Sequence, residues 1–345
     1  MDTIARVHEM PAADPAQLER LRKIYSEMVV PGRDGWLFLQ RDTNRSRDQM
    51  SGAVRLNPLQ LRQWRIVLDL RTAWLERLGI PYFVLIAPNA VSVYPEKRPE
   101  GYDIVEDRPI NQLLGHLKES GSFAPVIMPL QELLDAKREH LTYIPTDTHW
   151  SEFGAFVAYE ALMDSMERGG VDVRRLRRED LRITEEEDRG DLGVKLDPPL
   201  TSTHVLAEPR NPAARMVADN RIYNNGKNVV YECDQAPGRC FVQGDSFAYT
   251  LLHFMAESFG RVFYVHRPTF DYEAILAERP SAVVTVVTER FIIRVPQDLP
   301  YVPLARLVGQ RIKAGAVLPP AKDPASLRVL QEVPPHWDPY YEPEE

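Results

Sequence analysis

In its last third the chain reads Phe241-Val242-Gln243-Gly244-Asp245-Ser246-Phe247. An apolar, strand-like run ends in Gly-Asp-Ser, and a helical pattern of apolar residues begins immediately afterwards. A serine at such a turn lies at the C-terminal edge of a sheet, where open α/β folds bind their ligands. Helix-start N–H groups can stabilise an oxyanion there, and Gly244 lets the backbone approach closely. The stretch therefore predicts Ser246 as a nucleophile on a turn shaped by Gly244 and Asp245. The alternative is that Ser246 only caps the helix and Asp245 lies on the surface.

A serine nucleophile needs a base, and the base needs a group that orients it. Upstream, the chain reads Thr146-Asp147-Thr148-His149-Trp150. Alternate residues of an extended segment project to the same side, so Asp147 and His149 can meet. We predict His149 as general base, Asp147 as its orienting carboxylate and Trp150 as an apolar wall beside them. The alternative is a polar loop whose aspartate caps the following helix, in which case His266, at the end of a strand, is the best substitute base.

Strands and helices alternate along the chain, which indicates an α/β fold with a central, mostly parallel sheet flanked by helices. Apolar runs predict strands at 36–39, 82–86, 125–128, 240–243, 261–265 and 281–287. Helical spacing predicts helices at 14–29, 57–79, 108–119, 130–139, 151–167, 246–259, 271–278 and 302–313. We expect one domain over residues 1–315. Within it, residues 168–228 form an insertion or substrate loops, and residues 316–345 form a Pro-rich acidic tail.

The charge balance argues against a nucleic-acid partner. The net charge is −8 and the pI is near 5.6, whereas phosphate binding needs a clustered positive surface. The arginines of 174–178 are followed by the acidic run 185–188, which is typical of a solvated surface.

Hydropathy predicts no membrane-spanning segment, because no window approaches the roughly 18 apolar residues that a bilayer requires. Residues 1–18 contain no apolar core of a secretory signal. Taken at face value, these features predict a cytoplasmic protein; the alternative is a periplasmic protein whose chain has been trimmed.

The two cysteines leave a choice open. Cys233 and Cys240 could close a small disulfide loop in an exported protein, or remain free thiols in a reducing compartment. They are too few for a tetrahedral zinc site. We expect no metal and no other cofactor.

Several motifs together resemble a known family. Asp147-Thr148-His149-Trp150 upstream of Gly244-Asp245-Ser246-Phe247 is similar to the SGNH hydrolase-like domain of the alginate O-acetyltransferase (AlgX/AlgJ) family. Ordinary SGNH esterases carry the serine block first, so the order here resembles the circularly permuted arrangement of this group. Further likeness lies at Gly35-Trp36-Leu37-Phe38-Leu39, Gly190-Asp191-Leu192-Gly193 and Thr288-Glu289-Arg290.

The resemblance implies acetyl transfer from an acetyl donor to a carbohydrate hydroxyl through an acetyl-serine on Ser246, with polysaccharide biosynthesis as the setting. A membrane acyltransferase that delivers acetyl groups is a candidate partner. Two further residues are candidates for substrate binding. Asn89 ends a strand and could donate to the oxyanion, although Pro-Asn is also ordinary turn chemistry. Arg290 could bind an acidic sugar or a phosphate, or form a structural ion pair.

Three alternatives to the transferase remain at this point. An SGNH-type esterase would share the acyl-enzyme and let water attack it. A glycan-binding protein of the same fold would lack a connected site. A metal enzyme built on Asp147 and His149 would need further ligands that the sequence does not reveal.

Overall fold

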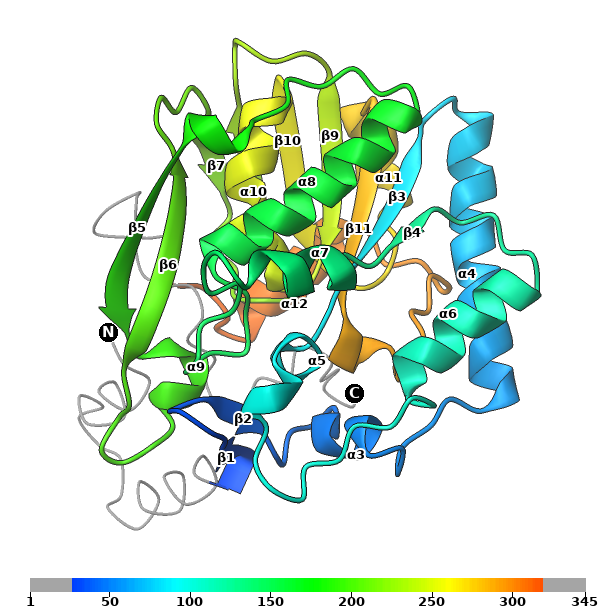
Figure 1. The fold of residues 1–345 in the computed structure, drawn as a ribbon. Helices are drawn as coiled ribbons and strands as arrows, with labels where there is room; N and C mark the ends of the chain where they lie inside the picture. The colour runs from blue at the N-terminus through cyan, green and yellow to red at the C-terminus, as the bar shows by residue number, and fades with distance from the viewer. Residues whose placement is uncertain (1–26, 319–345) are drawn as a thin grey trace.

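A seven-stranded sheet forms the centre of the computed structural model, which describes residues 27–318 (Figure 1). Its strand order is β4-β3-β11-β9-β10-β8-β7. The first five of these strands run parallel, and β8 and β7 are added antiparallel at the far edge. The α/β fold with a mostly parallel sheet is therefore confirmed.

The sheet strands are β3 (Tyr82–Ala87), β4 (Val126–Ile127), β7 (Arg215–Asp219), β8 (Asn228–Glu232), β9 (Arg239–Gly244), β10 (Arg261–His266) and β11 (Ala282–Thr288). The helices are α3 (Ser46–Met50), α4 (Pro58–Arg77), α5 (Ala90–Val93), α6 (Pro109–Glu119), α7 (Leu130–Ala136), α8 (Glu152–Arg168), α9 (Gly190–Gly193), α10 (Phe247–Ser258), α11 (Tyr272–Glu278) and α12 (Leu304–Lys313). Short 3-10 turns are η1 (Pro95–Lys97), η2 (Arg178–Asp180) and η3 (Glu289–Phe291).

Two apolar cores lie on the two faces of the sheet, because successive side chains of a strand point in opposite directions. On β3, Phe83 and Leu85 belong to the core that contains α8 and α10, whereas Val84 and Ile86 belong to the core that contains α4, α6 and α11. This is a three-layer α/β/α arrangement (Figure 1).

Every strand predicted above coincides with an observed strand, and the helices from 57–79 onward are present with ends shifted by a few residues. Capping sets two of the helix starts. Asn57 and Gln60 form a capping box at α4, and the Ser151 hydroxyl accepts the Gly154 N–H at α8.

Residues 168–228 are more regular than predicted. They contain η2, the antiparallel hairpin β5 (Leu181–Asp188) and β6 (Ser202–Pro209), α9, and the edge strand β7. The hairpin stands outside the central sheet beside α8 (Figure 1). Its β5 strand reads Leu-Arg-Ile-Thr-Glu-Glu-Glu-Asp and is largely exposed after Leu181, so its pattern lacks the apolar signal of a buried strand.

The chain ends are covered only in part. The predicted helix at 14–29 lies mostly outside the described residues, and Val29 belongs to strand β1 (Val29–Pro31), which pairs with β2 (Leu37–Leu39). The predicted tail at 316–345 lies outside the described residues beyond 318. The domain limits of 1–315 therefore stay a prediction.

Cys233 and Cys240 are both free and buried. Burial raises the pKa of the Cys240 thiol. Of the two alternatives left open by the sequence, the structure has the free thiols.

Candidate active site

The structure brings Asp147, His149 and Ser246 together at the C-terminal edge of the sheet. Ser246 follows β9 and precedes α10, while Asp147 and His149 lie in the loop before α8. The His149 Nε2 atom lies 2.7 Å from the Ser246 Oγ atom. The His149 Nδ1 atom lies 2.7 Å from the Asp147 Oδ1 atom. A carboxylate only accepts, so Nδ1–H donates to Asp147 and Nε2 is left to accept the serine proton.

The turn that carries Ser246 is held by its two predecessors. A Cβ atom at Gly244 would collide with the carbonyl oxygen of Val286, so only glycine allows β9 this close to β11. The Asp245 carboxylate accepts the N–H and the hydroxyl of Thr288, at 2.6 and 2.8 Å. Asp245 therefore anchors the turn and is not a surface residue.

The Ser246 side chain makes no capping hydrogen bond to α10. Its hydroxyl is bonded to His149 instead, and the residue is only half-buried. The capping alternative for Ser246 does not describe this structure.

Asp147 is buried, with 1% of its surface exposed, and accepts three hydrogen bonds. The donors are the His149 ring, the His149 backbone N–H at 2.8 Å and the Asp191 backbone N–H at 2.7 Å. Burial alone would raise the pKa of Asp147, but the charge and hydrogen bonds of His149 outweigh it and hold that pKa below its ordinary value. The Asp147 carboxylate is therefore ionised at neutral pH.

Asp191 is a site residue that sequence reasoning missed. Its side chain accepts the Thr148 N–H at 2.7 Å and the Thr148 hydroxyl at 2.6 Å, and its Oδ2 atom lies 4.0 Å from His149 Nδ1. The signal was present in Gly190-Asp191-Leu192-Gly193, which contributed to the family resemblance without a role being assigned.

The hairpin also supports this loop. Ser202 of β6 lies 2.7 Å from the Thr146 hydroxyl, and His204 of the same strand pairs with Glu152 at 2.5 Å. Residues 168–228 thus contain side chains that hold the Asp147–His149 loop and the start of α8 in place.

Phe247 forms the apolar wall of the site, a place predicted for Trp150. The Phe247 ring centroid lies 4.8 Å from that of His149 and 5.0 Å from that of Trp150. Trp150 and Phe247 are both buried, at 1% and 0% exposed, so neither ring offers a surface to a substrate. The role of Trp150 in substrate binding is corrected accordingly.

Asn89 and Arg290 reach the same edge of the sheet from β3 and β11. The Asn89 backbone N–H donates to Glu289 at 2.7 Å, and its side-chain amide makes no cap to α5. Glu289 is paired with Arg108 at 3.1 Å.

Arg290 is 7% exposed, and its guanidinium lies over the Phe247 and Phe291 rings, 5.2 and 5.0 Å from their centroids. Within residues 27–318 no carboxylate lies at ion-pair distance from it, but its charge reaches the buried Asp245 carboxyl group, whose pKa is raised by burial and lowered by Arg290. The structural ion pair considered for Arg290 is absent from this part of the chain.

His266, considered as a substitute base, has a different partner in the structure. Its Nδ1 atom lies 2.7 Å from the Tyr249 hydroxyl, and burial, with the charges of Lys227 and Arg311, lowers the pKa of His266 to about 3.

In the described part of the chain, one group of carboxylate and imidazole side chains lies close enough together to hold a metal ion. It consists of Asp147, His149 and Asp191. In this arrangement both His149 nitrogens already have partners, Asp147 and Ser246, which fits a proton relay.

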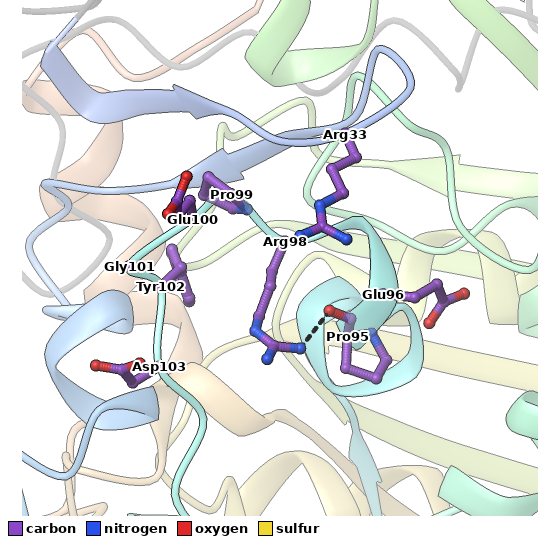
Figure 2. A pocket seen from close by; sticks show the side chains of 9 residues that line it. All are labelled: Arg33, Pro95, Glu96, Arg98, Pro99, Glu100, Gly101, Tyr102 and Asp103. Carbon is purple, nitrogen blue, oxygen red and sulfur yellow. Dashed lines mark hydrogen bonds between the residues drawn. The ribbon is translucent and has the colours of Figure 1, made fainter.

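A hollow of about 210 Å³ lies elsewhere, between the β1–β2 turn and the segment after η1 (Figure 2). It is lined by Arg33, Pro95, Glu96, Arg98, Pro99, Glu100, Gly101, Tyr102 and Asp103. Arg98 donates to the Pro95 carbonyl at 2.7 Å. The lining mixes two guanidiniums with three carboxylates and includes no predicted site residue, so it indicates no particular ligand.

Comparison with known proteins gives a family match over most of the described chain. Residues 29–255 match the family described as SGNH hydrolase-like domain, acetyltransferase AlgX. The probable alginate O-acetylase AlgJ of Pseudomonas putida is 32% identical over 144 residues, which cover 41% of this chain and 34% of that protein. The chain thus spans about a third of the length of the curated relatives it matches.

Two solved structures share the fold. Bacillus cereus PatB1 is 14% identical with a TM-score of 0.55, covering 76% of this chain and 96% of that one. A DHHW family protein from Eubacterium siraeum is 17% identical with a TM-score of 0.51, covering 82% and 98%.

The cytoplasmic location predicted from the sequence is wrong. The matching relatives are alginate O-acetylases of the AlgJ type, which are periplasmic proteins. Composition and site chemistry can be the same on either side of a membrane, so they could not decide the compartment. Between residues 27 and 318, no helix has the length and apolarity to cross a bilayer.

Proposed function

This chain belongs to the family of SGNH hydrolase-like domains of the acetyltransferase AlgX, and from that premise we propose that it transfers an acetyl group to a carbohydrate hydroxyl through Ser246. The observation that carries the proposal is the continuous hydrogen-bonded series from Asp147 through His149 to Ser246, with both links at 2.7 Å. This spacing is what a serine nucleophile and its base require.

In the first half-reaction the Ser246 oxygen attacks the acetyl carbonyl carbon of an ester or thioester donor. Its proton passes to His149 Nε2, and the ionised Asp147 stabilises the imidazolium that forms. Collapse of the tetrahedral intermediate breaks the donor's acyl bond, and His149 returns the proton to the leaving group. The product of this step is acetyl-Ser246.

In the second half-reaction a sugar hydroxyl attacks the acetyl-serine carbonyl carbon. His149 takes the hydroxyl proton and then gives it back to the Ser246 oxygen as the new ester leaves. Both half-reactions pass through an oxyanion. We assign its stabilisation to N–H groups at the start of α10 and to the Asn89 side chain, which is the role predicted for Asn89.

We assign Arg290 to the acceptor. The Arg290 guanidinium forms no close ion pair, and Asp245, the carboxyl group that its charge reaches, already accepts from Thr288. A ligand anion can therefore still bind Arg290, and a sugar carboxylate suits its bidentate geometry. The curated relatives are named for alginate, so an oligouronate is the first acceptor to test. Arg290→Met should raise the KM for an oligouronate about tenfold or more and leave that for a neutral oligosaccharide unchanged. Equal effects on both acceptors would contradict the assignment.

The test of the whole proposal uses p-nitrophenyl acetate as donor, with an oligouronate as acceptor, and intact-mass spectrometry. Wild-type protein should gain the mass of one acetyl group on Ser246 and pass it to the oligosaccharide. Ser246→Ala should do neither while remaining folded. A wild-type protein that is never acetylated, by this donor or by an acetyl thioester, would overturn the proposal and favour the glycan-binding alternative.

The same assay separates transfer from hydrolysis. If acetate is released at the same rate with and without acceptor and no acetylated sugar forms, the chain is an esterase. A membrane partner that supplies the acetyl group stays a prediction from the family resemblance.

A further inference from the structure

The segment Gly190-Asp191-Leu192-Gly193 clamps the loop that carries the base. The Leu192 and Gly193 N–H groups both donate to the Thr146 carbonyl, at 3.0 and 2.9 Å. Gly190 has a φ of +61°, and a Cβ atom there would collide with the same carbonyl. The backbone of α9 is thus fitted against the residue preceding Asp147.

Asp191 forms further hydrogen bonds to two neighbouring residues of the loop, Asp147 and Thr148. Its backbone N–H donates to Asp147 Oδ2, while its carboxylate accepts both donors of Thr148. These hydrogen bonds hold Asp147 and Thr148 in one fixed orientation relative to each other. Since His149 is the next residue, its position is fixed by the same contacts.

The Asp191 carboxylate also places a second negative charge beside the imidazole. The Nδ1 edge of His149 faces Asp147 Oδ1 at 2.7 Å and Asp191 Oδ2 at 4.0 Å. Burial, followed by the charge of Asp147, raises the pKa of Asp191, while Lys195 opposes this. Nearby, burial lowers the pKa of His204, but Glu152, followed by the charges of Asp147 and Asp188, outweighs burial and raises it.

We infer that Asp191 is a positioning residue of the proposed transferase: it fixes the Asp147–Thr148–His149 turn and stabilises the His149 imidazolium as a second carboxylate. The inference rests on the function proposed for this site. It assigns Asp191 no contact with substrate, since Asp191 acts through His149.

The experiment compares Asp191→Asn and Asp191→Ala with wild type. Asparagine keeps an acceptor for the Thr148 N–H and removes the charge. We expect Asp191→Asn to move the acid limb of the kcat/KM profile about one pH unit lower and kcat to fall about tenfold, because the imidazolium loses a nearby opposite charge. Asp191→Ala should show the same displacement and a larger loss of rate.

A direct readout does not depend on turnover. Nitrogen-15 NMR follows the His149 ring resonances as a function of pH, and their absence in His149→Gln identifies them. The pH midpoint of this titration should also move lower in Asp191→Asn. If no acetyl-enzyme forms in wild type but this midpoint moves, the proposed function fails and the placement of Asp191 stands.

A control variant separates Asp191 from the other charges of the same region. Glu185→Gln removes an exposed carboxylate of strand β5 and should leave both the His149 titration midpoint and kcat at their wild-type values. An Asp191→Asn variant with the wild-type midpoint and wild-type kcat would overturn the inference.

Discussion

At the scale of single residues, the Asp147 carboxylate is buried and nonetheless ionised. Three hydrogen bonds, two of them from backbone N–H groups, compensate for its loss of hydration. Backbone donors cannot rotate away, so the carboxylate is held in one orientation toward His149 Nδ1. A small change at this atom should therefore disturb the base without unfolding the chain.

Asp147→Asn tests this point. The amide would favour the wrong tautomer of His149, leaving Nε2 protonated and unable to accept from Ser246, so kcat should fall by about 10⁴-fold. Steady-state kinetics of acetyl transfer measure the loss. Circular dichroism and thermal unfolding should show a folded protein, and a variant with near wild-type turnover would contradict the assigned role.

Gly244 positions the nucleophile because it has no side chain and so lets β9 pack closely against β11. Gly244→Ala would push its methyl group into the Val286 carbonyl, so we expect a loss of about 2 kcal/mol or more in the free energy of unfolding, together with lost activity. Chemical denaturation gives the value. Gly115→Ala is the matched control: no atom lies near its Cβ position in α6, so it should be neutral or stabilising by up to about 1 kcal/mol.

At the scale of elements, the end of β11 holds three parts of the site in succession. Thr288 donates to Asp245 and so fixes the serine turn. Glu289 accepts from the Asn89 N–H and the Ser92 hydroxyl, both at 2.7 Å, and so fixes the start of α5. Arg290 follows with its guanidinium over Phe247. One short turn therefore couples the ends of β3, β11 and β9.

Glu289→Gln should release this coupling. Arg108 would lose its buried partner, and we expect the free energy of unfolding to fall by about 3 kcal/mol, with a higher KM as the Asn89 segment loosens. The control is Glu96→Gln, which removes a half-exposed partner of Lys137 and should cost less than about 1 kcal/mol. Equal losses in the two variants would show that the Glu289 contacts contribute no more than a surface pair.

At the scale of the whole molecule, parallel strands place their C-terminal ends at one edge, and every candidate group of the site is found there or in the loops that cover it. The surface away from this edge carries paired charges. Arg174 pairs with Glu257, Arg175 with Asp164 and Glu167, and Arg178 with Glu139 and Glu160. The basic cluster of the sequence is therefore a neutralised surface.

Global stability should fall on mild acidification because of His266. The pKa of His266 is about 3 in the folded state, below its ordinary value of about 6.5. Between these two pH values the unfolded chain therefore binds a proton at His266 and the folded chain does not. This contribution is complete above pH ~6.5 and is lost as the pH falls toward 3, with a slope of at most about 1.4 kcal/mol per pH unit.

His266→Gln keeps an acceptor for the Tyr249 hydroxyl and removes the titration. Denaturant unfolding between pH 6.5 and 5.5, about one unit or more above the ordinary pKa of carboxylates, should show a flatter pH dependence of the unfolding free energy than in wild type. An unchanged slope would mean that His266 is not the group responsible.

The sequence by itself determined the parallel strands of the sheet, the helices between them and the three residues Asp147, His149 and Ser246 that the structure brings together. The apolar repeats that predict strands and helices involve only residues close together in the chain. Asp147 and His149 are two residues apart, so their pairing could also be predicted without the tertiary structure. Gly244-Asp245-Ser246 was likewise legible because a strand, a tight turn and a helix adjoin in the chain.

Only the tertiary structure decided which distant groups complete the site. Asp191 lies 42 residues beyond His149 in the short helix α9, between the exposed strand β5 and strand β6, and its role arises from hydrogen bonds to a loop that it meets through folding. Phe247, and not Trp150, packs against the His149 ring, because this contact depends on how α8 and α10 face each other. Burial and hydrogen-bond partners, which set the charge state of Asp147 and His266, exist only once those elements have come together.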